Sequence, residues 1–523
     1  MLRKIKSVFS FQFSVFRKEI FLCLLSAVLL ILSFPRFNIE FFAWVGFVPL
    51  FFAIQNKSKC KVFFLSYLTG IIFWLGIIYW LIHVTFIGLI FLVLYLALYF
   101  GIFGLIISTI DHRLSTIDAL FIPSLWVILE YIRSHLFTGF GWALLGYSQY
   151  LNLVSIQIAD ITGVYGVSFL IMTVNVAIKE VLGFRSEVLG RKKQAVFMIM
   201  FCSVFFIGAL LYGYYRLNQT PNTQHQTPIK VSIIQGNIPQ ELKWQSYSQE
   251  FILDRYIKLS KEASLHKPDL IIWPEASSSG FLFKQADAWI FQNMFNLAKE
   301  LKANLLIGTI VIDKSDYFNS VVLIDSYGAI IKRYDKIHLV PFGEYIPLKR
   351  TLPFLKTIVP IGDFAGGREY TVFKVTSRKP QAASQDSFSV LICFEDLFPE
   401  LSRRFVKNGA GFMVNITNDA WFGRTSSPFQ HLALSVMRAV ENRRFLVRAA
   451  NTGVSCFITP EGAIKSLVSD NKGRAIFITG HKTADISTQS RSITFYTRHG
   501  DVFILACLIL VIYGIISKDR KRG

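Results

Sequence analysis

Residues 390–396 of this 523-residue chain read Val-Leu-Ile-Cys-Phe-Glu-Asp. Three apolar residues of strand type lead into Cys393, and an amphipathic pattern that predicts a helix over 397–408 follows directly. A short buried strand that passes into a helix is typical of α/β layering. A thiol at such a junction feels the positive N-terminal end of the helix, which favours the thiolate. Cys393 is therefore a candidate nucleophile.

Two further stretches place a charged residue directly after an apolar strand. LIIWPEAS at 270–277 carries Glu275 beyond a proline turn, and YDKIHLVPFGE at 334–344 carries Lys336 among aromatic and apolar residues. Taken singly, a glutamate after a strand, such as Glu275, is usually a solvated turn residue, and a loop lysine such as Lys336 is usually a surface charge. A cysteine at the end of a strand, such as Cys393, is usually a small core residue. Together they supply a nucleophile, a general base and an oxyanion stabiliser. Spacing alone does not show that the three meet.

Short apolar strands alternate with amphipathic helices through much of the second half of the chain. This alternation predicts an α/β domain. The predicted strands are 230–235, 270–273, 305–310, 319–325, 329–334, 390–393 and 412–416, and the predicted helices are 247–266, 286–302, 397–408 and 429–444.

Eight apolar segments flank this domain and predict a multi-pass α-helical membrane region. Crossing a bilayer takes about 20 apolar residues, so the first two segments are short, and either extend into their flanks or, for the second, form a re-entrant helix. The first ends without a small-x-small cleavage site, so we expect an uncleaved helix rather than a signal peptide. The segments are 19–34, 41–55, 62–83, 86–110, 118–137, 155–178, 195–215 and 501–517.

Lysine and arginine cluster in alternate loops between these segments. Cytoplasmic loops of membrane proteins are enriched in both residues. With eight spans, the N-terminus, the loop 57–61, the stretch 179–193 and the tail 518–522 all fall on one side. We therefore expect both termini in the cytoplasm and the large polar block on the opposite side. The predicted regions are a seven-helix transmembrane region at 1–215, a linker at 216–228, a catalytic domain at 229–490, and a final helix with a basic tail at 491–523.

The composition argues against an ordinary soluble protein. Apolar residues make up 53% of the chain and charged residues 17%, where soluble chains carry about 25% charged residues. The net charge of +21 does not require nucleic acid, because many basic residues lie in membrane-flanking loops and no recognition motif is present. The six cysteines form no disulfide framework. His338, His431 and His499 are too scattered for a metal site, and we expect hydrogen-bonded or surface histidines.

Three polar residues interrupt the fifth apolar segment: Glu130, Arg133 and His135. Charged residues inside membrane spans are costly and often functional. We favour a position at the helix end, in the membrane interface, over a direct role with substrate.

The stretches around Glu275, Lys336 and Cys393 resemble the Glu–Lys–Cys triad of the carbon–nitrogen hydrolase (nitrilase) superfamily, in the same chain order. Further motifs resemble the membrane-bound branch of that superfamily, the apolipoprotein N-acyltransferases of bacteria. The layout of seven helices, catalytic domain and final helix is similar too, so the resemblance covers nearly the whole chain. The further motifs are QGNIP at 235–239, LKW at 242–244, NDAWFG at 418–423, QH at 430–431, RA at 438–439 and RAANTG at 448–453.

The resemblance implies an αββα sandwich and a ping-pong acyl transfer that uses no metal or cofactor. Cys393 would attack an acyl ester of a membrane phospholipid, typically phosphatidylethanolamine. Glu275 would take the thiol proton and later return it, and Lys336 would hold the oxyanion. The acyl chain would pass from the Cys393 thioester to the α-amine of the diacylglyceryl N-terminal cysteine of an apolipoprotein. The family also implies the bacterial inner membrane, with the catalytic domain on the periplasmic side.

Four supporting residues carry over from the same motifs. Glu344 matches a second glutamate that supports the family's site, and Glu395 matches the acidic residue two positions after the nucleophile. Trp244 matches a tryptophan placed near the substrate. Phe394 stands where many members have tyrosine, which removes one possible hydrogen bond, and we favour simple apolar packing for it.

Two apolar stretches of the catalytic domain are candidates for membrane contact. They are 351–367, which contains two prolines and ends in a glycine pair, and 281–283. Exposed apolar loops on an extramembrane domain commonly mark a partner or a membrane. The two stretches either dip into the outer leaflet and gate acyl-chain entry or are buried in the domain core.

Two other function classes compete with acyl transfer. A membrane-tethered amidase would use the same triad and release its product to water, although a soluble substrate needs no eight-span platform. A waiting acyl-enzyme also benefits from a dry site. A transporter or binding protein would have no reason to keep Glu275, Lys336 and Cys393 together.

Overall fold

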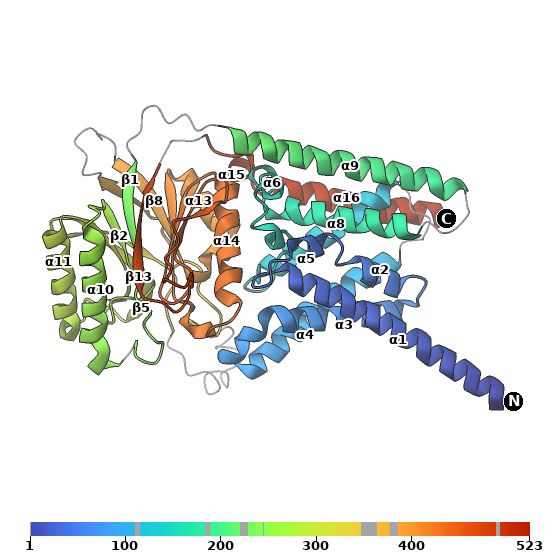
Figure 1. Ribbon diagram of the computed structural model, residues 1–523, viewed down its shortest axis with the longest axis horizontal. Helices are drawn as coiled ribbons and strands as arrows, with labels where there is room; N and C mark the ends of the chain where they lie inside the picture. Colours follow the sequence, from blue (N-terminus) through green and yellow to red (C-terminus); the bar gives the residue numbers. More distant parts are fainter. Residues whose placement is uncertain are drawn as a thin grey trace. The chain divides into compact units, whose positions relative to one another are not determined.

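The computed structural model describes residues 2–109, 116–183, 189–219, 228–243, 245–346, 363–376, 385–487 and 492–522. Two units are present: the first comprises Met1–Asn218 and His499–Gly523, and the second is Gln219–Arg498. The first is helical, and the second is built on two β-sheets, as Figure 1 shows.

One sheet of the second unit has the order β13-β1-β2-β4-β5-β6, with β3 added beside β4. Its centre is parallel, since β1 pairs with β2 and β2 with β4 in parallel register, whereas β13, β5 and β6 join antiparallel. Near-continuous apolar burial along β1 and β4 fits strands that are covered on both faces. The strands are β1 (Ile229–Gln235), β2 (Leu270–Ile272), β3 (Phe281–Leu282), β4 (Asn304–Asp313), β5 (Asp316–Ile324), β6 (Ile330–Asp335) and β13 (Gly480–Ile486).

The second sheet has the order β12-β11-β10-β9-β8-β7. Strands β8, β9 and β10 run parallel at its centre. The strands are β7 (Val372–Thr376), β8 (Gln385–Ile392), β9 (Phe412–Thr417), β10 (Leu446–Ala450), β11 (Cys456–Ile458) and β12 (Ile464–Lys465).

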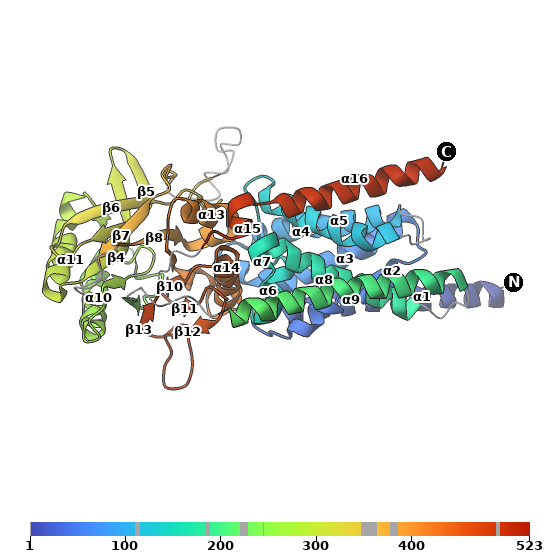
Figure 2. The same cartoon turned by 90° about the horizontal axis from the view of Figure 1, so that it is seen from above.

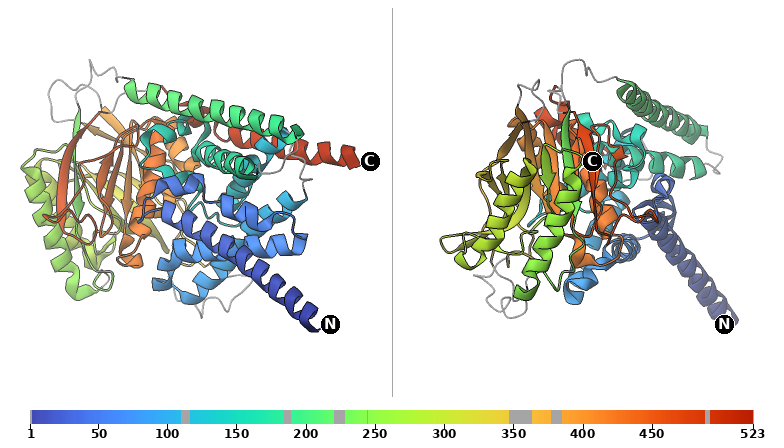
Figure 3. Two further views of the ribbon diagram at one scale, coloured as in Figure 1. Left: turned by 45° about the vertical axis from the view of Figure 1, so that its right-hand side comes forward. Right: turned by 60° about the vertical axis from the view of Figure 1, so that its left-hand side comes forward.

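Helices cover the outer face of each sheet. Helices α10 (Gln249–Ser264) and α11 (Ala288–Leu301) flank the first sheet and lie side by side in both views of Figure 3. Helices α13 (Pro399–Lys407) and α14 (Ser427–Asn442) flank the second sheet, as Figures 1 and 2 show. The buried residues of α10 and α11 recur at helical spacing, which is why both helices form against the sheet. The unit is therefore an αββα sandwich. Every strand and helix predicted between 229 and 444 is present, with the largest shift at the start of β8, which begins at Gln385 rather than at 390. Strands β3 and β7 were not predicted.

The first unit contains the apolar helices. Its longer helices are α1 (Leu2–Ser33), α3 (Lys59–Ile78), α4 (Phe86–Ser108), α5 (Thr116–His135), α8 (Val164–Leu182), α9 (Leu189–Asn218) and α16 (Val502–Arg522), and shorter ones are α2 (Val48–Ile54), α6 (Leu153–Ile156) and α7 (Ala159–Thr162). A Cβ on Gly70 of α3 would lie 3.0 Å from the Ala97 Cα of α4, so this small residue lets the two helices approach closely.

Within the described ranges, three helical stretches are long and apolar enough to cross a membrane: Lys59–His83, Phe86–Ser108 and Val164–Leu182. Shorter apolar stretches occupy Glu40–Ile54, Leu153–Thr162 and Val502–Ser517. The layout of eight spans stays a prediction. The predicted single segment 155–178 is wrong: it divides into α6, α7 and α8, because Gly163 at φ +66° ends α7 before α8 begins.

Glu130, Arg133 and His135 lie near the end of α5, which ends at His135, as predicted. Their place in the membrane interface stays a prediction. The side chains of Glu130 and Arg133 are buried, and that of His135 is exposed. The Arg133 guanidinium donates to the carbonyls of Phe140 and Trp142, at 2.8 and 2.7 Å. The Glu130 carboxylate accepts from the Leu145 N–H at 2.6 Å. These charges fasten the chain that follows α5 back onto that helix.

Candidate active site

Cys393 lies immediately after β8 and begins the 3-10 turn η7 (Cys393–Leu397). Its backbone has φ +53°, a conformation that costs a non-glycine residue of the order of 1–3 kcal/mol. Two side chains hold its carbonyl: Asn415 Nδ2 donates to it at 3.0 Å, and His431 Nε2 lies 3.3 Å away. The fold therefore imposes this turn on Cys393.

A fully buried network of ionic side chains lies next to this turn. His431 lies between two carboxylates, with Nδ1 2.9 Å from Asp419 Oδ1 and Nε2 3.0 Å from Asp396 Oδ1. Burial and the Arg448 charge lower the pKa of His431, but both carboxylates outweigh them and raise it above its ordinary value. Arg448 lies 3.5 Å from Asp396 and 3.3 Å from Asp419. Two cations thus balance two anions beneath Cys393, and the expectation of a hydrogen-bonded histidine is confirmed for His431.

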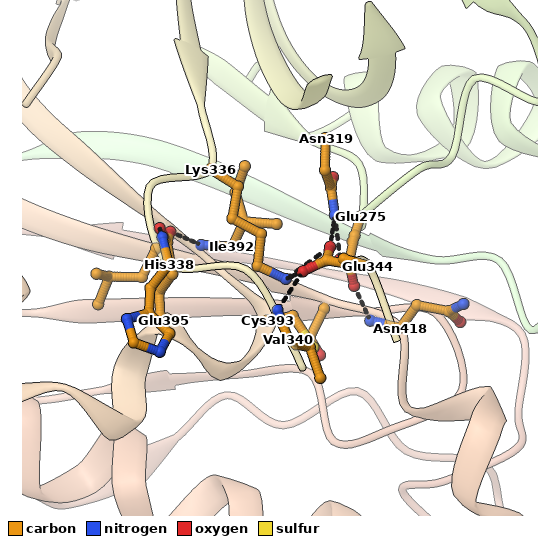
Figure 4. A network of polar contacts seen from close by, with 12 residues as sticks. Glu275, Asn319, Lys336, His338, Val340, Glu344, Ile392, Cys393, Glu395 and Asn418 are labelled. Carbon is orange, nitrogen blue, oxygen red and sulfur yellow. Dashed lines mark hydrogen bonds and ion pairs between the residues drawn. The ribbon is translucent and has the colours of Figure 1, made fainter. Parts of the chain in front are cut away.

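Glu275 follows β2 and the Pro274 turn, and only 8% of the residue surface is exposed. Asn319 Nδ2 donates to its Oε1 at 2.8 Å, and the Asn418 N–H donates to its Oε2 at 2.9 Å. Asn319 belongs to β5 of the first sheet and Asn418 follows β9 of the second. Both sheets therefore position this carboxylate (Figure 4).

The Glu275 turn also requires a glycine on the neighbouring strand. A Cβ built on Gly308 of β4 would lie 2.3 Å from the Pro274 carbonyl oxygen and 2.8 Å from the Glu275 Cα. A close approach of this kind excludes any side chain at position 308.

Lys336 follows β6, and only 1% of its surface is exposed. Its Nζ lies 2.9 Å from Glu344 and 3.8 Å from Glu275 Oε1. Burial opposes the charge on Lys336, but Glu344 and Glu275 outweigh it and raise the pKa of the ammonium above its ordinary value. Lys336 is therefore a cation throughout the physiological range. Asn319 Nδ2 also donates to Glu344 Oε1 at 2.7 Å, so one amide joins both carboxylates.

Glu395 links the turn at Cys393 to the segment that carries Lys336. Its carboxylate accepts from the N–H groups of Ile392 and Ile337 at 2.8 Å and of His338 at 3.1 Å, and from the Tyr334 hydroxyl at 2.8 Å. Burial raises the pKa of Glu395 to about 7, against the lowering effect of these donors.

The Cys393 thiol is protonated at rest. Burial and the Glu275 charge raise its pKa well above the ordinary value, and Lys336 lowers it only in part. The expectation that a helix N-terminus favours the thiolate is therefore wrong. The turn η7 spans five residues, and the helix α13 begins only at Pro399.

Phe394 packs as an apolar residue. Its ring stacks on Phe422 with centroids 5.6 Å apart and meets His431 edge-on at 5.1 Å. Trp244 and residues 351–362 lie outside the described residues. In the stretch 281–283, Leu282 is buried, Phe281 meets Tyr317 edge-on and Phe283 is 70% exposed.

The structure brings Glu275, Lys336, Glu344, Cys393 and Glu395 into one cluster, drawn in Figure 4. Sequence reasoning assigned no role to Asn319, Asn418, Asp396 or Lys243. The motifs at 242–244 and 418–423 contain two of these residues, but nothing in them says what the side chains contact. Among the described residues, no group of three or more His, Cys, Asp or Glu side chains could hold a metal ion.

Two family models match this chain. Residues 26–177 match the model of the apolipoprotein N-acyltransferase N-terminal domain, and 230–483 match that of the carbon–nitrogen hydrolases. The chain is 40% identical over 510 residues to the apolipoprotein N-acyltransferase of Geobacter metallireducens, with 94% of each chain covered. It is 30% identical to those of Chlorobaculum tepidum, with 97% of each covered, and Pasteurella multocida, with 96% of each covered.

The chain belongs to the apolipoprotein N-acyltransferase family. The predicted resemblance is therefore confirmed, and so is the predicted fold class, a helical membrane domain joined to a nitrilase-like domain. The protein is an acyltransferase and a membrane protein.

Proposed function

We propose that this protein moves an acyl chain from a membrane phospholipid, through a thioester on Cys393, to the α-amine of the lipidated N-terminal cysteine of apolipoproteins. The observation that carries the proposal is the buried cluster in which Lys336 lies 3.8 Å from Glu275 and both charges act on the Cys393 thiol. A membrane protein of this family with such a cluster has the parts for acyl transfer between two lipids.

Acylation begins with a neutral thiol and a carboxylate. Glu275 takes the proton from Cys393 Sγ as the sulfur attacks the ester carbonyl carbon, and the carbonyl oxygen becomes an oxyanion beside the Lys336 ammonium. The oxyanion collapses, the carbon–oxygen bond of the ester breaks, and Glu275 returns the proton to the departing lysophospholipid oxygen. The thioester remains on Cys393.

Deacylation uses the same groups in reverse. The acceptor amine attacks the thioester carbonyl, Lys336 again stabilises the oxyanion, and Glu275 takes a proton from the amine. Collapse breaks the carbon–sulfur bond, and the proton passes to the Cys393 sulfur. The product is an amide, and the thiol is regenerated.

Charge neutralisation explains why Glu344 accompanies the triad in this mechanism. Lys336 is buried with carboxylates on both sides, at 2.9 Å for Glu344 and 3.8 Å for Glu275. When Glu275 is protonated during catalysis, Glu344 still holds the ammonium in place. Glu395 acts through the backbone, because it binds the N–H groups of Ile337 and His338 next to Lys336.

The membrane arrangement is part of the proposal. The boundaries 1–215, 216–228, 229–490 and 491–523, the cytoplasmic termini and a catalytic domain on the periplasmic side of the bacterial inner membrane rest on the loop charges. Phosphatidylethanolamine as donor rests on the family resemblance. So does a place for Trp244 near the substrate.

Of the apolar stretch 281–283, Phe283 is the exposed residue, so we propose that it is the one that dips into the outer leaflet where acyl chains enter. A charged residue there would oppose insertion into lipid. We expect Phe283→Asp to slow acylation from bilayer phospholipid and to leave acylation from a short-chain, water-soluble ester unchanged. Equal rates for wild type and variant on both donors would show that Phe283 has no part in acyl-chain entry.

The transfer assay separates acyl transfer from hydrolysis. Purified protein in detergent is incubated with phosphatidylethanolamine that carries a labelled acyl chain and with a diacylated lipopeptide that has a free N-terminal amine. We expect the lipopeptide to gain one acyl chain as a base-stable amide, and Cys393→Ala to give none. Release of free fatty acid alone, at the same rate with or without lipopeptide, would show a tethered hydrolase instead.

A further inference from the structure

A second lysine reaches the active site and has no part in the steps above. Lys243 is 2% exposed, and its Nζ donates to the main-chain carbonyl of Glu275 at 2.8 Å. The segment before it is fixed, because Asn451 exchanges two 2.8 Å hydrogen bonds with the backbone of Ile238. Lys243 therefore reaches Glu275 from an anchored loop.

Burying an ammonium without a compensating charge is strongly unfavourable. The charged groups that act on Lys243 in the described structure are Glu275 and Cys393, and no carboxylate lies within ion-pair distance of its Nζ there. Lys336 in contrast has Glu344 at 2.9 Å. Lys336 and Lys243 therefore both act on Glu275 and Cys393, but in the described structure Lys336 has a carboxylate within ion-pair distance and Lys243 does not.

We infer that Lys243 is a positioning residue for acyl transfer: its ammonium anchors the Glu275 backbone and stabilises the negative charge as that charge moves from Glu275 to the Cys393 sulfur. The inference rests on the proposed function. In the acylation step the proton leaves Sγ for Glu275, so negative charge builds up on the sulfur, near the same ammonium, before it passes to the carbonyl oxygen beside Lys336. Lys243 itself gives up no proton in the cycle.

The role of Lys243 has a pH limit. Burial lowers the pKa of Lys243 to about 8, although Glu275 and Cys393 act in the opposite direction. The ammonium is present below this pH and is lost as the pH rises through it. The stabilisation of the thiolate is lost at the same time, so acylation declines above about pH 8.

Two variants and two readouts test the role. Lys243→Met removes the charge and nearly keeps the length of the side chain, whereas Lys243→Arg keeps a charge that does not titrate in this range. The exposed Lys258→Met is the matched control. The first readout is the rate of thioester formation from phosphatidylethanolamine as a function of pH. The second is alkylation of Cys393 by iodoacetamide without lipid, followed by peptide mass.

We expect Lys243→Met to slow both reactions at pH 7 by about tenfold or more and to abolish the decline above pH 8. Lys243→Arg should shift the decline in rate to higher pH. If Lys243→Met does not fold, the pH profile of Lys243→Arg alone tests the inference. Unchanged rates and pH profiles in Lys243→Met, or an unchanged alkaline decline in folded Lys243→Arg, would overturn the inference. If wild type forms no thioester with any phospholipid while alkylation still depends on Lys243, the proposed function fails and the role of Lys243 in activating the thiol stands.

Discussion

Asn319 offers a sharp test of how the base is held. Its single side-chain amide donates to Glu275 Oε1 at 2.8 Å and to Glu344 Oε1 at 2.7 Å, and only 5% of its surface is exposed. Asn319→Leu keeps the approximate volume and removes both donors. Glu275 retains one donor, the Asn418 N–H at 2.9 Å.

The magnitude follows from the charge on the acceptors. A hydrogen bond to a charged group contributes about 1.5–3 kcal/mol. The bond orients Glu275, and if the free energy needed to restore that orientation in the acylation transition state is of this size, the rate of thioester formation falls about 10- to 150-fold, since each 1.4 kcal/mol is tenfold. Loss of the bond to Glu344 adds to the destabilisation of the folded state and lowers Tm.

The assay is the single-turnover rate of thioester formation on Cys393, followed by intact mass. The matched control is Asn293→Leu, since Asn293 is an exposed residue of α11 whose amide donates to the Trp289 carbonyl. We expect the control to keep the wild-type rate. A folded Asn319→Leu protein with the wild-type rate would refute the role of this amide and weaken the assignment of Glu275 as base.

Three further outcomes are expected. Gly308→Ala should slow acylation at least about tenfold, because its Cβ would lie 2.3 Å from the Pro274 carbonyl oxygen and displace the Glu275 turn. The control Gly208→Ala, which has nothing within 4 Å of the new Cβ, should keep the wild-type rate. Equal rates for the two variants would contradict this prediction. His431→Leu should destabilise the catalytic domain by about 3–5 kcal/mol, seen as a large drop in Tm, because it leaves two buried carboxylates with one cation; an unchanged Tm would mean that the network is not ionic. The Glu395 pKa of about 7 lies above the ordinary carboxyl value, so the contribution of Glu395 to folding stability is largest at acid pH and is lost as the pH rises towards 7. This pH-dependent part of the Tm profile should be missing in Glu395→Gln. Identical Tm profiles for wild type and variant would contradict a raised pKa for Glu395.

The alternation of strands and helices in the catalytic domain could be predicted from the sequence. Short Val- and Ile-rich strands next to amphipathic helices predict α/β layering through local pattern, whereas the αββα arrangement was implied by the family resemblance. Strands β1, β2, β4, β5, β6, β8 and β9 overlap the predicted strands, but β3 and β7 were not predicted. Pairing between distant strands was not predictable. Strand β13 joins β1 antiparallel at the edge of the sheet, with Ile486 opposite Ile229, and no local signal connects those residues.

The proposed catalytic groups could be predicted only as a set. Glu275, Lys336 and Cys393 stand out because each follows an apolar strand in a recognisable motif. Asn319 lies inside β5 and looks like any other strand residue, although it bonds both carboxylates. Its role depends on Glu275 and Glu344, which lie on other segments of the chain, and sequence spacing does not show that these segments meet.

The protonation state of Cys393 shows a different limit. A strand followed by a helical pattern predicts a low thiol pKa, but the five-residue turn η7 separates the sulfur from α13. Burial and the neighbouring Glu275 then decide the balance and keep the thiol neutral. Local pattern cannot distinguish a 3-10 turn from the first turn of a helix.

The most direct test of the central claim is detection of the acyl-enzyme itself. Purified protein is mixed with phosphatidylethanolamine that carries a labelled acyl chain, in the absence of acceptor, and its intact mass is measured before and after hydroxylamine. The account predicts one hydroxylamine-labile acyl group on Cys393, absent from Cys393→Ala and discharged when a diacylated lipopeptide is added. A folded wild-type protein that transfers acyl chains to the lipopeptide without ever carrying this adduct would contradict it.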